Sequence, residues 1–431
     1  MPWLRRPFGL IKDEYVQAYR GLPARAWLLF AVNLINASGG MVLFFLSLYL
    51  TRELGLSTAR AGLVLSVYGA GSLAGALAGG WLSDRVGSIR AQKASLAVCG
   101  VLLIALGQVR TMAGILPLLF CLALAAGTLY PANTTSMAKI CPAGLQIKGF
   151  ALNRLANNLG ATIGPAIGGV LAMRDYRLLF WADGLTSLAA AAVFAALWKG
   201  ARVSREIESG ARDRNAGEGS GGSAACDGSG GDAVARPKAL SPWRDGPFLL
   251  MMAIFLVWCL IFVQLLTTFP LYMRNVYGMA ENRIGQLFAV NTIIIVALEM
   301  ILMERIRKYP RDRMINISFL LLGLGLGLMP LGRGFAYGAL TVAIWTVGEM
   351  LSMPLVTALI AERADDSNRG RYMGVFSFVF SLAFIIAPAG GTAIYDRFGP
   401  DAVWYVCAAL SVLIAVAFSA LRPSLGSDHS K

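Results

Sequence analysis

Residues 80–90 read Gly-Trp-Leu-Ser-Asp-Arg-Val-Gly-Ser-Ile-Arg and lie between two strongly apolar stretches, 61–82 and 91–109. A helix of about 20 apolar residues crosses the hydrocarbon core of a bilayer, which is about 30 Å thick. Each flanking stretch has this length. We therefore expect residues 80–90 to form a short charged loop between two transmembrane helices.

The same pattern extends along the whole chain in both directions. The composition is 57% hydrophobic and 14% charged, whereas a soluble domain carries roughly 25% charged residues. We predict an all-α membrane protein embedded in the lipid bilayer, because backbone groups in lipid must be hydrogen-bonded within the segment. Its twelve transmembrane helices are predicted at 27–50, 61–82, 91–109, 114–138, 150–172, 178–198, 248–273, 284–303, 314–331, 335–361, 372–395 and 402–421.

The distribution of Lys and Arg predicts the orientation of these helices. Of the 38 basic residues, 28 fall in the two termini and in the loops on their side, nine fall in the opposite loops, and Arg154 lies within a span. Basic loops stay in the cytoplasm, so both termini are expected there. The net charge of +14 is explained by these loops, and no basic patch interleaved with aromatic residues indicates nucleic-acid binding.

A Gly- and Ser-rich segment divides the spans into six and six. Its composition is typical of a flexible linker. Paired features on either side recur at offsets of 220 to 223 residues, for example Pro131 with Pro354, which indicates a duplicated unit. The predicted organisation is a cytoplasmic N-terminal segment (1–26), a six-helix bundle (27–198), a cytoplasmic linker (199–247), a second six-helix bundle (248–421) and a cytoplasmic tail (422–431).

The sequence contains few residues that could bind a metal ion or catalyse a reaction. His429 is the single histidine, and the six cysteines are scattered without a C-x-x-C pair, so we expect no metal site. We find no set of nucleophile, base and orienting residue at one depth and no phosphate-binding G-x-x-x-x-G-K-[ST] loop. We therefore expect neither an enzyme nor an ATP-driven pump.

Residues 80–90 resemble the G-x-x-x-D-R-x-G-R-[RK] signature of the major facilitator superfamily. The resemblance rests on Gly80, Asp84, Arg85, Gly87 and Arg90, with Ser88 departing from the pattern. It implies two pseudo-symmetric six-helix bundles that rock about a central site, as in a secondary transporter. It also implies that Asp84 and Arg85 contact the start of the eleventh span in the outward-facing state. The alternative is a generic basic loop.

A second motif resembles the G-x-x-x-G-P-x-x-G-G signature of the drug:proton antiporters in that superfamily. Its residues are Gly160, Gly164, Pro165, Gly168 and Gly169. Glycines at this spacing form a flat stripe on which another helix packs closely. The related sequence APAGG at 387–391 keeps a second interpretation open, in which symmetric helix packing alone explains the stripe.

Glu349 is the candidate for proton coupling. A proton-coupled carrier needs an ionisable group within the membrane, and Glu349 lies near the middle of its span. The alternative is a buried hydrogen-bonding residue. For Arg154 we weigh interfacial location, pairing with Asp84 and anion binding in that order of preference, and we expect Asp183 to begin a helix.

Uncharged polar residues within the spans are candidates for a substrate cavity. For each of them the alternative is an interhelical hydrogen bond. The candidates are Asn33, Asn36, Tyr130, Asn133, Gln264 and Asn291.

The predicted function is proton-coupled efflux of a small hydrophobic or amphipathic compound by alternating access. The resemblance also allows a proton-coupled importer of a sugar or peptide, or a lipid flippase on the same fold. We expect no bound cofactor, because the proton gradient supplies the energy. We further expect a monomer in the plasma membrane of a bacterial cell.

Overall fold

The computed structural model describes residues 21–142, 145–198, 242–306, 308–363 and 368–421. These residues are almost entirely helical, and no β-strand occurs among them. Most of the predicted N-terminal segment, linker and C-terminal tail lies outside the described residues, so those assignments stay predictions. The helices of the first half after residue 57 are α4 (Thr58–Val86), α5 (Ser88–Gln108), α6 (Met112–Ile140), α7 (Gln146–Ala172) and α8 (Arg177–Leu197).

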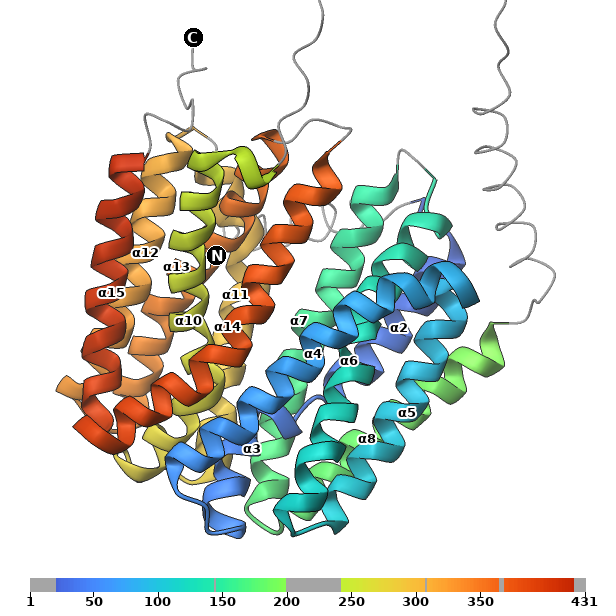
Figure 1. Cartoon of the computed structure of the whole chain (residues 1–431), viewed down its shortest axis with the longest axis horizontal. Helices are drawn as coiled ribbons and strands as arrows, with labels where there is room; N and C mark the ends of the chain where they lie inside the picture. Colours follow the sequence, from blue (N-terminus) through green and yellow to red (C-terminus); the bar gives the residue numbers. More distant parts are fainter. Residues whose placement is uncertain (1–20, 143–144, 199–241, 307, 364–367, 422–431) are drawn as a thin grey trace, which may run out of the picture.

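The second half begins with a short 3-10 turn, Pro242–Arg244, and continues with six helices. They are α10 (Gly246–Asn275), α11 (Glu281–Ile306), α12 (Arg311–Leu328), α13 (Phe335–Arg363), α14 (Arg369–Phe398) and α15 (Pro400–Leu421). Figure 1 shows the two halves side by side as separate groups of helices, with α4 beside α14 and α7 beside α11 at their boundary.

Each of the twelve predicted spans corresponds to helix in the structure, which confirms the predicted fold class. Among the described residues, ten helical stretches are long and apolar enough to cross a membrane. The two that fall short of this standard, α7 and α11, carry several polar side chains and pack against each other. They run through the same thickness as the other helices (Figure 1).

The first span departs from its prediction as one continuous helix. It consists of α2 (Ala24–Gly39), α3 (Val42–Leu48) and a turn of π-helix, Tyr49–Glu53. The break falls at two successive glycines, where Gly40 has a ψ of 64° and the Met41 amide bonds the Gly39 carbonyl. Two adjacent glycines make this departure from helical geometry inexpensive.

Close backbone packing holds α4 against α6 within the first bundle. Gly71, Gly75 and Gly79 lie on one face of α4, and a Cβ on Gly75 would lie only 2.1 Å from the carbonyl oxygen of Leu124. Lipid supplies no hydrophobic driving force between helices, so association depends on this kind of close van der Waals contact.

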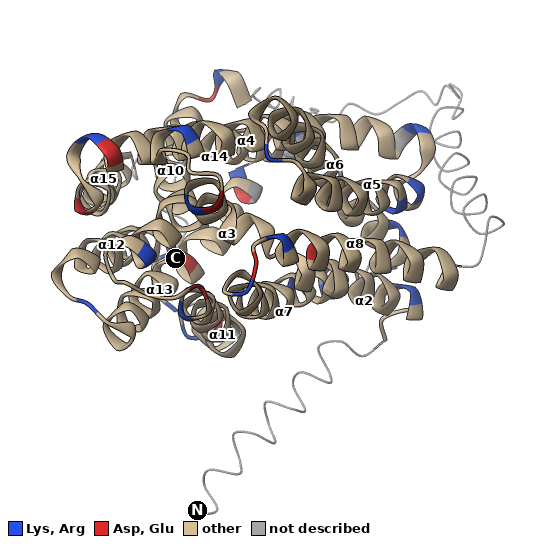
Figure 2. Ribbon diagram, turned by 90° about the horizontal axis from the view of Figure 1, so that it is seen from below, with Lys and Arg blue, Asp and Glu red and all other residues tan. Residues whose placement is uncertain are grey.

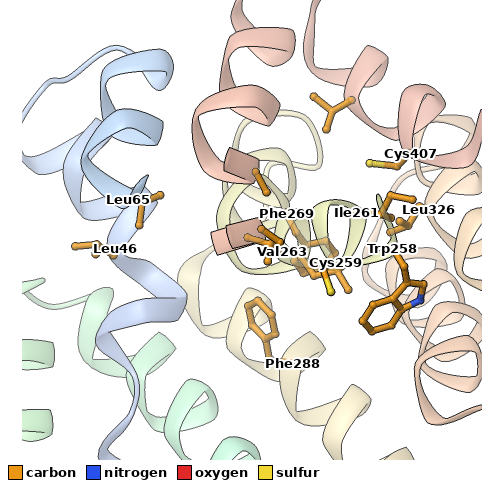
Figure 3. Packing of buried hydrophobic residues seen from close by; sticks show 14 of the residues in the cluster. Leu46, Leu65, Trp258, Cys259, Ile261, Val263, Phe269, Phe288, Leu326 and Cys407 are labelled. Atoms are coloured by element: carbon orange, nitrogen blue, oxygen red, sulfur yellow. The ribbon is translucent and has the colours of Figure 1, made fainter. Parts of the chain in front are cut away.

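The apolar core continues across both bundles. Figure 3 shows Phe269 and Phe288 in the second bundle with Leu46 and Leu65 of the first bundle at the other side of the view. The ring of Phe288 lies 5.5 Å from that of Phe269 and 4.8 Å from that of Phe44 on the first span. Phe288 thus links the two bundles through edge-on aromatic contacts.

Gly75→Ala should destabilise the folded protein, because its new methyl group meets backbone that has no room to yield. Overpacking of this kind costs about 1–3 kcal/mol. The matched control is Gly80→Ala on the same helix, since a Cβ there meets no atom within 4 Å. Thermal unfolding in detergent should show a lower unfolding temperature for Gly75→Ala and an unchanged or slightly higher one for Gly80→Ala. Equal unfolding temperatures for the two variants would contradict this account.

Candidate functional site

The bundles meet first along α4 and α14. Gly62 and Gly69 on α4 face α14 so closely that a Cβ on Gly69 would lie 2.2 Å from the Phe384 carbonyl oxygen. The Asp396 carboxylate accepts a hydrogen bond of 2.8 Å from the Ala59 amide at the start of α4. An acidic group is favourable at that end of a helix. We call this contact the α4–α14 seam.

The second contact between bundles, the α7–α11 seam, uses part of the antiporter-like motif. A Cβ on Gly169 would lie 2.4 Å from the Glu281 carbonyl oxygen, and the Pro165 carbonyl oxygen lies against Gly285. The other motif glycines, Gly160, Gly164 and Gly168, face residues 37–45 of the first span. The motif therefore lies where α7 packs both on its own bundle and on the other one.

Both seams are closed near one membrane face, which we call the closed end. There the Tyr176 hydroxyl donates a hydrogen bond of 2.9 Å to Glu281, and Arg274 lies 3.6 Å from the same carboxylate. These residues come from both bundles and surround a buried acidic group. The contact is therefore polar as well as closely packed.

The α4–α14 seam separates toward the opposite face, which we call the separated end. Further along the α4–α14 seam, Leu77 is 69% exposed and Phe378 is 43% exposed. A Cβ on Gly80 or Gly374 would meet nothing within 4 Å. Figure 1 shows α4 and α14 diverging in this direction. Along the α4–α14 seam the bundles are thus closed at one end and spread at the other, whereas the α7–α11 seam stays bridged by the Arg154–Glu299 ion pair.

The signature segment 80–90 lies at the separated end. The prediction that it forms a loop is wrong, because α4 continues to Val86 and α5 begins at Ser88, which leaves Gly87 as the connection. The guanidinium of Arg85 lies 4.4 Å from the centre of the Trp81 ring, Gly87 ends α4 with a φ of 89°, and Arg90 lies in the first turn of α5. The side chain of Asp84 is outside the described part of the structure, so its predicted contact with the eleventh span stays a prediction.

Glu349 lies within α13 and faces α11. Its carboxylate accepts a hydrogen bond of 3.0 Å from the Asn291 side-chain amide, which also donates one of 2.9 Å to Thr346. The positive charge of Arg154 on the other bundle favours the ionised form of the Glu349 carboxyl electrostatically, although Arg154 forms its ion pair with Glu299. The structure thus brings together two predicted residues, Glu349 and Asn291, with a cation from the opposite bundle.

Arg154 itself forms an ion pair with Glu299 across the α7–α11 seam. None of the three interpretations made from the sequence named Glu299 as a partner of Arg154, and the interfacial location of Arg154 stays a prediction. Arg154 and Glu299 lie in different repeats, and no local spacing connects them. The signal available in the sequence was that each is a charge in a span that is less apolar than its neighbours.

The other cavity candidates differ in their contacts. Asn33 and Asn133 both donate hydrogen bonds of 2.9 Å to the Asn153 side chain, and Asn33 also bonds Asn157. Asn36 accepts one of 3.2 Å from Ser187.

Gln264 is buried and donates to the Ala387 carbonyl oxygen of α14 at 2.8 Å. Tyr130, by contrast, is 72% exposed. Burial and these contacts make Asn133 and Gln264 interhelical hydrogen-bonding residues in this conformation. The sequence did not single out Asn153 or Asn157, which join α7 to α2 and α6.

Outside the membrane spans, Asp245 joins the start of α10 to the end of α13. Its carboxylate accepts hydrogen bonds from Arg363 at 2.6 and 2.7 Å, from the Phe248 amide at 3.1 Å and from the Tyr372 hydroxyl at 3.0 Å. Burial alone raises the pKa of this carboxyl, but these hydrogen bonds outweigh it and lower the pKa below the ordinary value.

Two six-helix bundles that meet along two seams, with one seam spread at one end, have the architecture of a secondary membrane transporter. The chain belongs to the Major Facilitator Superfamily, whose family model matches residues 28–365 and 284–430. It is therefore a multi-pass membrane protein of a transporter family and not an enzyme.

Three relatives cover most of this chain and most of their own lengths. The uncharacterized MFS-type transporter YttB of Bacillus subtilis (strain 168) is 24% identical over 89% of this chain and 90% of its own. A Na(+), Li(+), K(+)/H(+) antiporter of Planococcus maritimus is 26% identical, covering 82% and 85%. The multidrug resistance protein MdtH of Edwardsiella ictaluri (strain 93-146) is 25% identical, covering 84% and 85%.

Solved structures show the same fold. A crystal structure of the peptide transporter POT in complex with sulfate superimposes with a TM-score of 0.77 at 18% identity, covering 95% of this chain and 96% of that one. A crystal structure of the nucleoside transporter NupG gives a TM-score of 0.73 at 14% identity, covering 92% and 98%. At this level of identity the likeness concerns the fold alone.

Arg154→Gln and Glu299→Gln should each lower the unfolding temperature slightly, because the Arg154 side chain is 53% exposed and ion pairs with an exposed member contribute about 0–1 kcal/mol. The exchanged double variant, Arg154→Glu with Glu299→Arg, should recover part of the loss by restoring an opposite-charge pair. A double-mutant cycle built from the single reversals Arg154→Glu and Glu299→Arg and from the exchanged double variant measures the coupling by thermal unfolding. Strictly additive losses in the exchanged variant would contradict a direct pair.

The lowered pKa of Asp245 predicts a pH dependence of stability. A carboxyl with a depressed folded-state pKa stabilises the fold above its unfolded-state pKa, and this contribution disappears as the pH falls through the folded-state pKa. Asp245→Asn should therefore unfold at a lower temperature than the wild type at neutral pH, with a difference that shrinks in acid. Glu362→Gln, which removes an exposed pair with Arg311, is the control and should change little. A difference that is constant with pH would argue against this role.

Proposed function

We propose that this protein exports small hydrophobic or amphipathic compounds in exchange for protons by alternating access. The observation that carries the proposal is the position of Glu349, an ionisable group within a span that lies close to the inter-bundle pair of Arg154 and Glu299. Ionisable residues inside membrane spans are functional in most transporters. A proton bound there changes the charge at the contact that must rearrange when the bundles rock.

The mechanism follows from competition between two acids for one cation. When Glu349 is ionised, it attracts Arg154 toward α13; when it is protonated, Arg154 is left to Glu299 on α11. The two arrangements place α7 differently against the second bundle. A proton therefore favours one conformation over the other, which is the condition for a ligand to drive a conformational change.

The substrate class is suggested by the surface at the separated end. Side chains exposed there along α4 and α14 are apolar or aromatic, namely Leu77, Trp81 and Phe378, and Tyr130 on α6 is more exposed still. Aromatic and apolar walls suit amphipathic compounds. The relatives named a multidrug resistance protein and a cation/proton antiporter support export coupled to protons.

A second candidate substrate is a monovalent cation, and the name of the Planococcus maritimus relative favours it. In that case Na⁺, Li⁺ or K⁺ would leave the cell as protons enter. Both candidates use the same coupling residue, so the transport assay below is run with each.

The cellular setting belongs to the same proposal. The excess of Lys and Arg on one side supports cytoplasmic termini and a structure whose separated end faces the cytoplasm. We propose a monomer in a bacterial plasma membrane that uses the proton gradient without a bound cofactor. The orientation can be tested in intact cells with variants that carry a single cysteine at one terminus of the protein. Labelling of either cysteine by a membrane-impermeant reagent would contradict cytoplasmic termini.

Glu349→Gln should abolish substrate movement driven by a pH gradient while leaving substrate counterflow within a few-fold of wild type. The amide keeps a hydrogen-bonding group beside Asn291 but cannot exchange a proton. The measurement is uptake into everted vesicles or proteoliposomes under an imposed gradient, with a panel of lipophilic compounds and with Na⁺, Li⁺ and K⁺. Glu362→Gln on the surface is the matched control. Normal gradient-driven uptake by Glu349→Gln would disprove the coupling role.

A further inference from the structure

A second acidic residue is buried in the other bundle, and the proposed function does not use it. Asp183 lies in the second turn of α8 and is 7% exposed. Its Oδ2 accepts a hydrogen bond of 3.2 Å from the Val42 amide, directly after the break between α2 and α3. The sequence suggested that Asp183 begins a helix, but it lies inside α8 and contacts the broken first span.

Three polar side chains on one face of α8 contact this break. Besides Asp183, Ser187 donates a hydrogen bond of 3.2 Å to Asn36. Thr186 occupies the space where a Cβ on Gly39 would lie. Residues at i, i+3 and i+4 share a helix face, so the three side chains form one polar surface against residues 36–42. The break and the carboxyl group thus belong to one arrangement.

No cation balances the carboxyl group. Among the residues the structure describes, no Lys or Arg forms an ion pair with Asp183. The titratable neighbours close enough to interact with it are Tyr68 on α4 and Cys99 on α5. Neither the tyrosine hydroxyl nor the cysteine thiol can carry a positive charge, so neither can balance the Asp183 carboxylate. The Val42 amide begins the seven-residue helix α3, and the start of so short a helix offsets only part of the cost of burying a charge. We therefore expect the buried acid to adopt its neutral form.

We propose that Asp183 is a second proton-binding site, separate from Glu349, and that it carries its proton in the conformation described here. The protonated carboxyl group still accepts from the Val42 amide through its carbonyl oxygen. Its ionised form needs solvent, so the proton leaves only when the break between α2 and α3 becomes accessible to water. Proton release is thereby tied to rearrangement of the first span.

Infrared spectroscopy of the purified protein tests this without any substrate. As the pH is raised, the wild type should lose the carbonyl-stretch bands of protonated carboxyl groups. One of the titrating bands should be absent from Asp183→Asn and retained in Glu349→Gln, whereas a band from Glu349 should behave in the opposite way. Asp183→Glu, which restores an acid, should restore a band. Loss of every titrating band in Glu349→Gln, with none lost in Asp183→Asn, would overturn the assignment and leave the role of Glu349 intact.

Two further infrared measurements test the assignment if the Asp183→Asn variant cannot be purified. If Asp183→Asn does not fold, isotope-labelled aspartate in the wild-type protein should shift the titrating band, whereas labelled glutamate should shift only a band from Glu349. An unshifted spectrum with labelled aspartate refutes the proposal. Addition of Na⁺ at constant pH should leave the aspartate band unchanged. Its displacement by Na⁺ would overturn a proton-only site in favour of a cation site.

Discussion

The requirement that every backbone polar group in lipid finds a partner within the protein is the constraint on which this structure depends. It commits each span to helix and leaves helix association to close packing and to a few polar contacts. Both seams between the bundles reflect this. At Gly69 and Gly285 the missing side chains let one helix backbone lie directly against another. These surfaces are flat and can separate without exposing unpaired backbone groups.

Polar residues are concentrated where two helices protect each other. The helices α7 and α11 fall below the apolarity of the other ten spans, and they face each other across the bundle boundary, as Figure 2 shows from below. Glu299 is largely covered at this boundary, whereas the Arg154 side chain that pairs with it stays half exposed. The least apolar helices can cross the membrane because they do so side by side, and this also places charges at the boundary that must move.

The fold could be predicted from the sequence because the long apolar segments that indicate membrane spans recur along the whole chain. Windows of about 20 apolar residues predict each span independently of the others. The same averaging hid the break in the first span, because Gly39 and Gly40 barely change the mean of a long apolar window. A pair of adjacent glycines within a span was the available signal. Whether the two glycines break the helix also depends on Asp183, which is distant in sequence and accepts a hydrogen bond from the Val42 amide after the break.

The site was predictable in part. Glu349 and Asn291 could be selected because polar groups at mid-depth are rare, and the structure joins them. Depth in a span does not determine which way a side chain points, however. Gln264 and Asn133 are buried among helices, whereas Tyr130 is exposed. The partner of Arg154 could not be selected from one sequence, since the contact joins different repeats.

The two buried acids differ in a way that bears on how the bundles can act together. Glu349 lies close to a cation from the opposite bundle, so its charge affects how the bundles attract each other. Asp183 has only its own bundle as partner and bonds the backbone at a break in the first span, so its charge affects the shape of that bundle. A proton at the first site changes the contact between the halves, and a proton at the second changes one of the halves themselves. Rocking of two rigid bundles needs only the proton site at Glu349. A carrier whose first span also bends needs the proton sites at both Glu349 and Asp183.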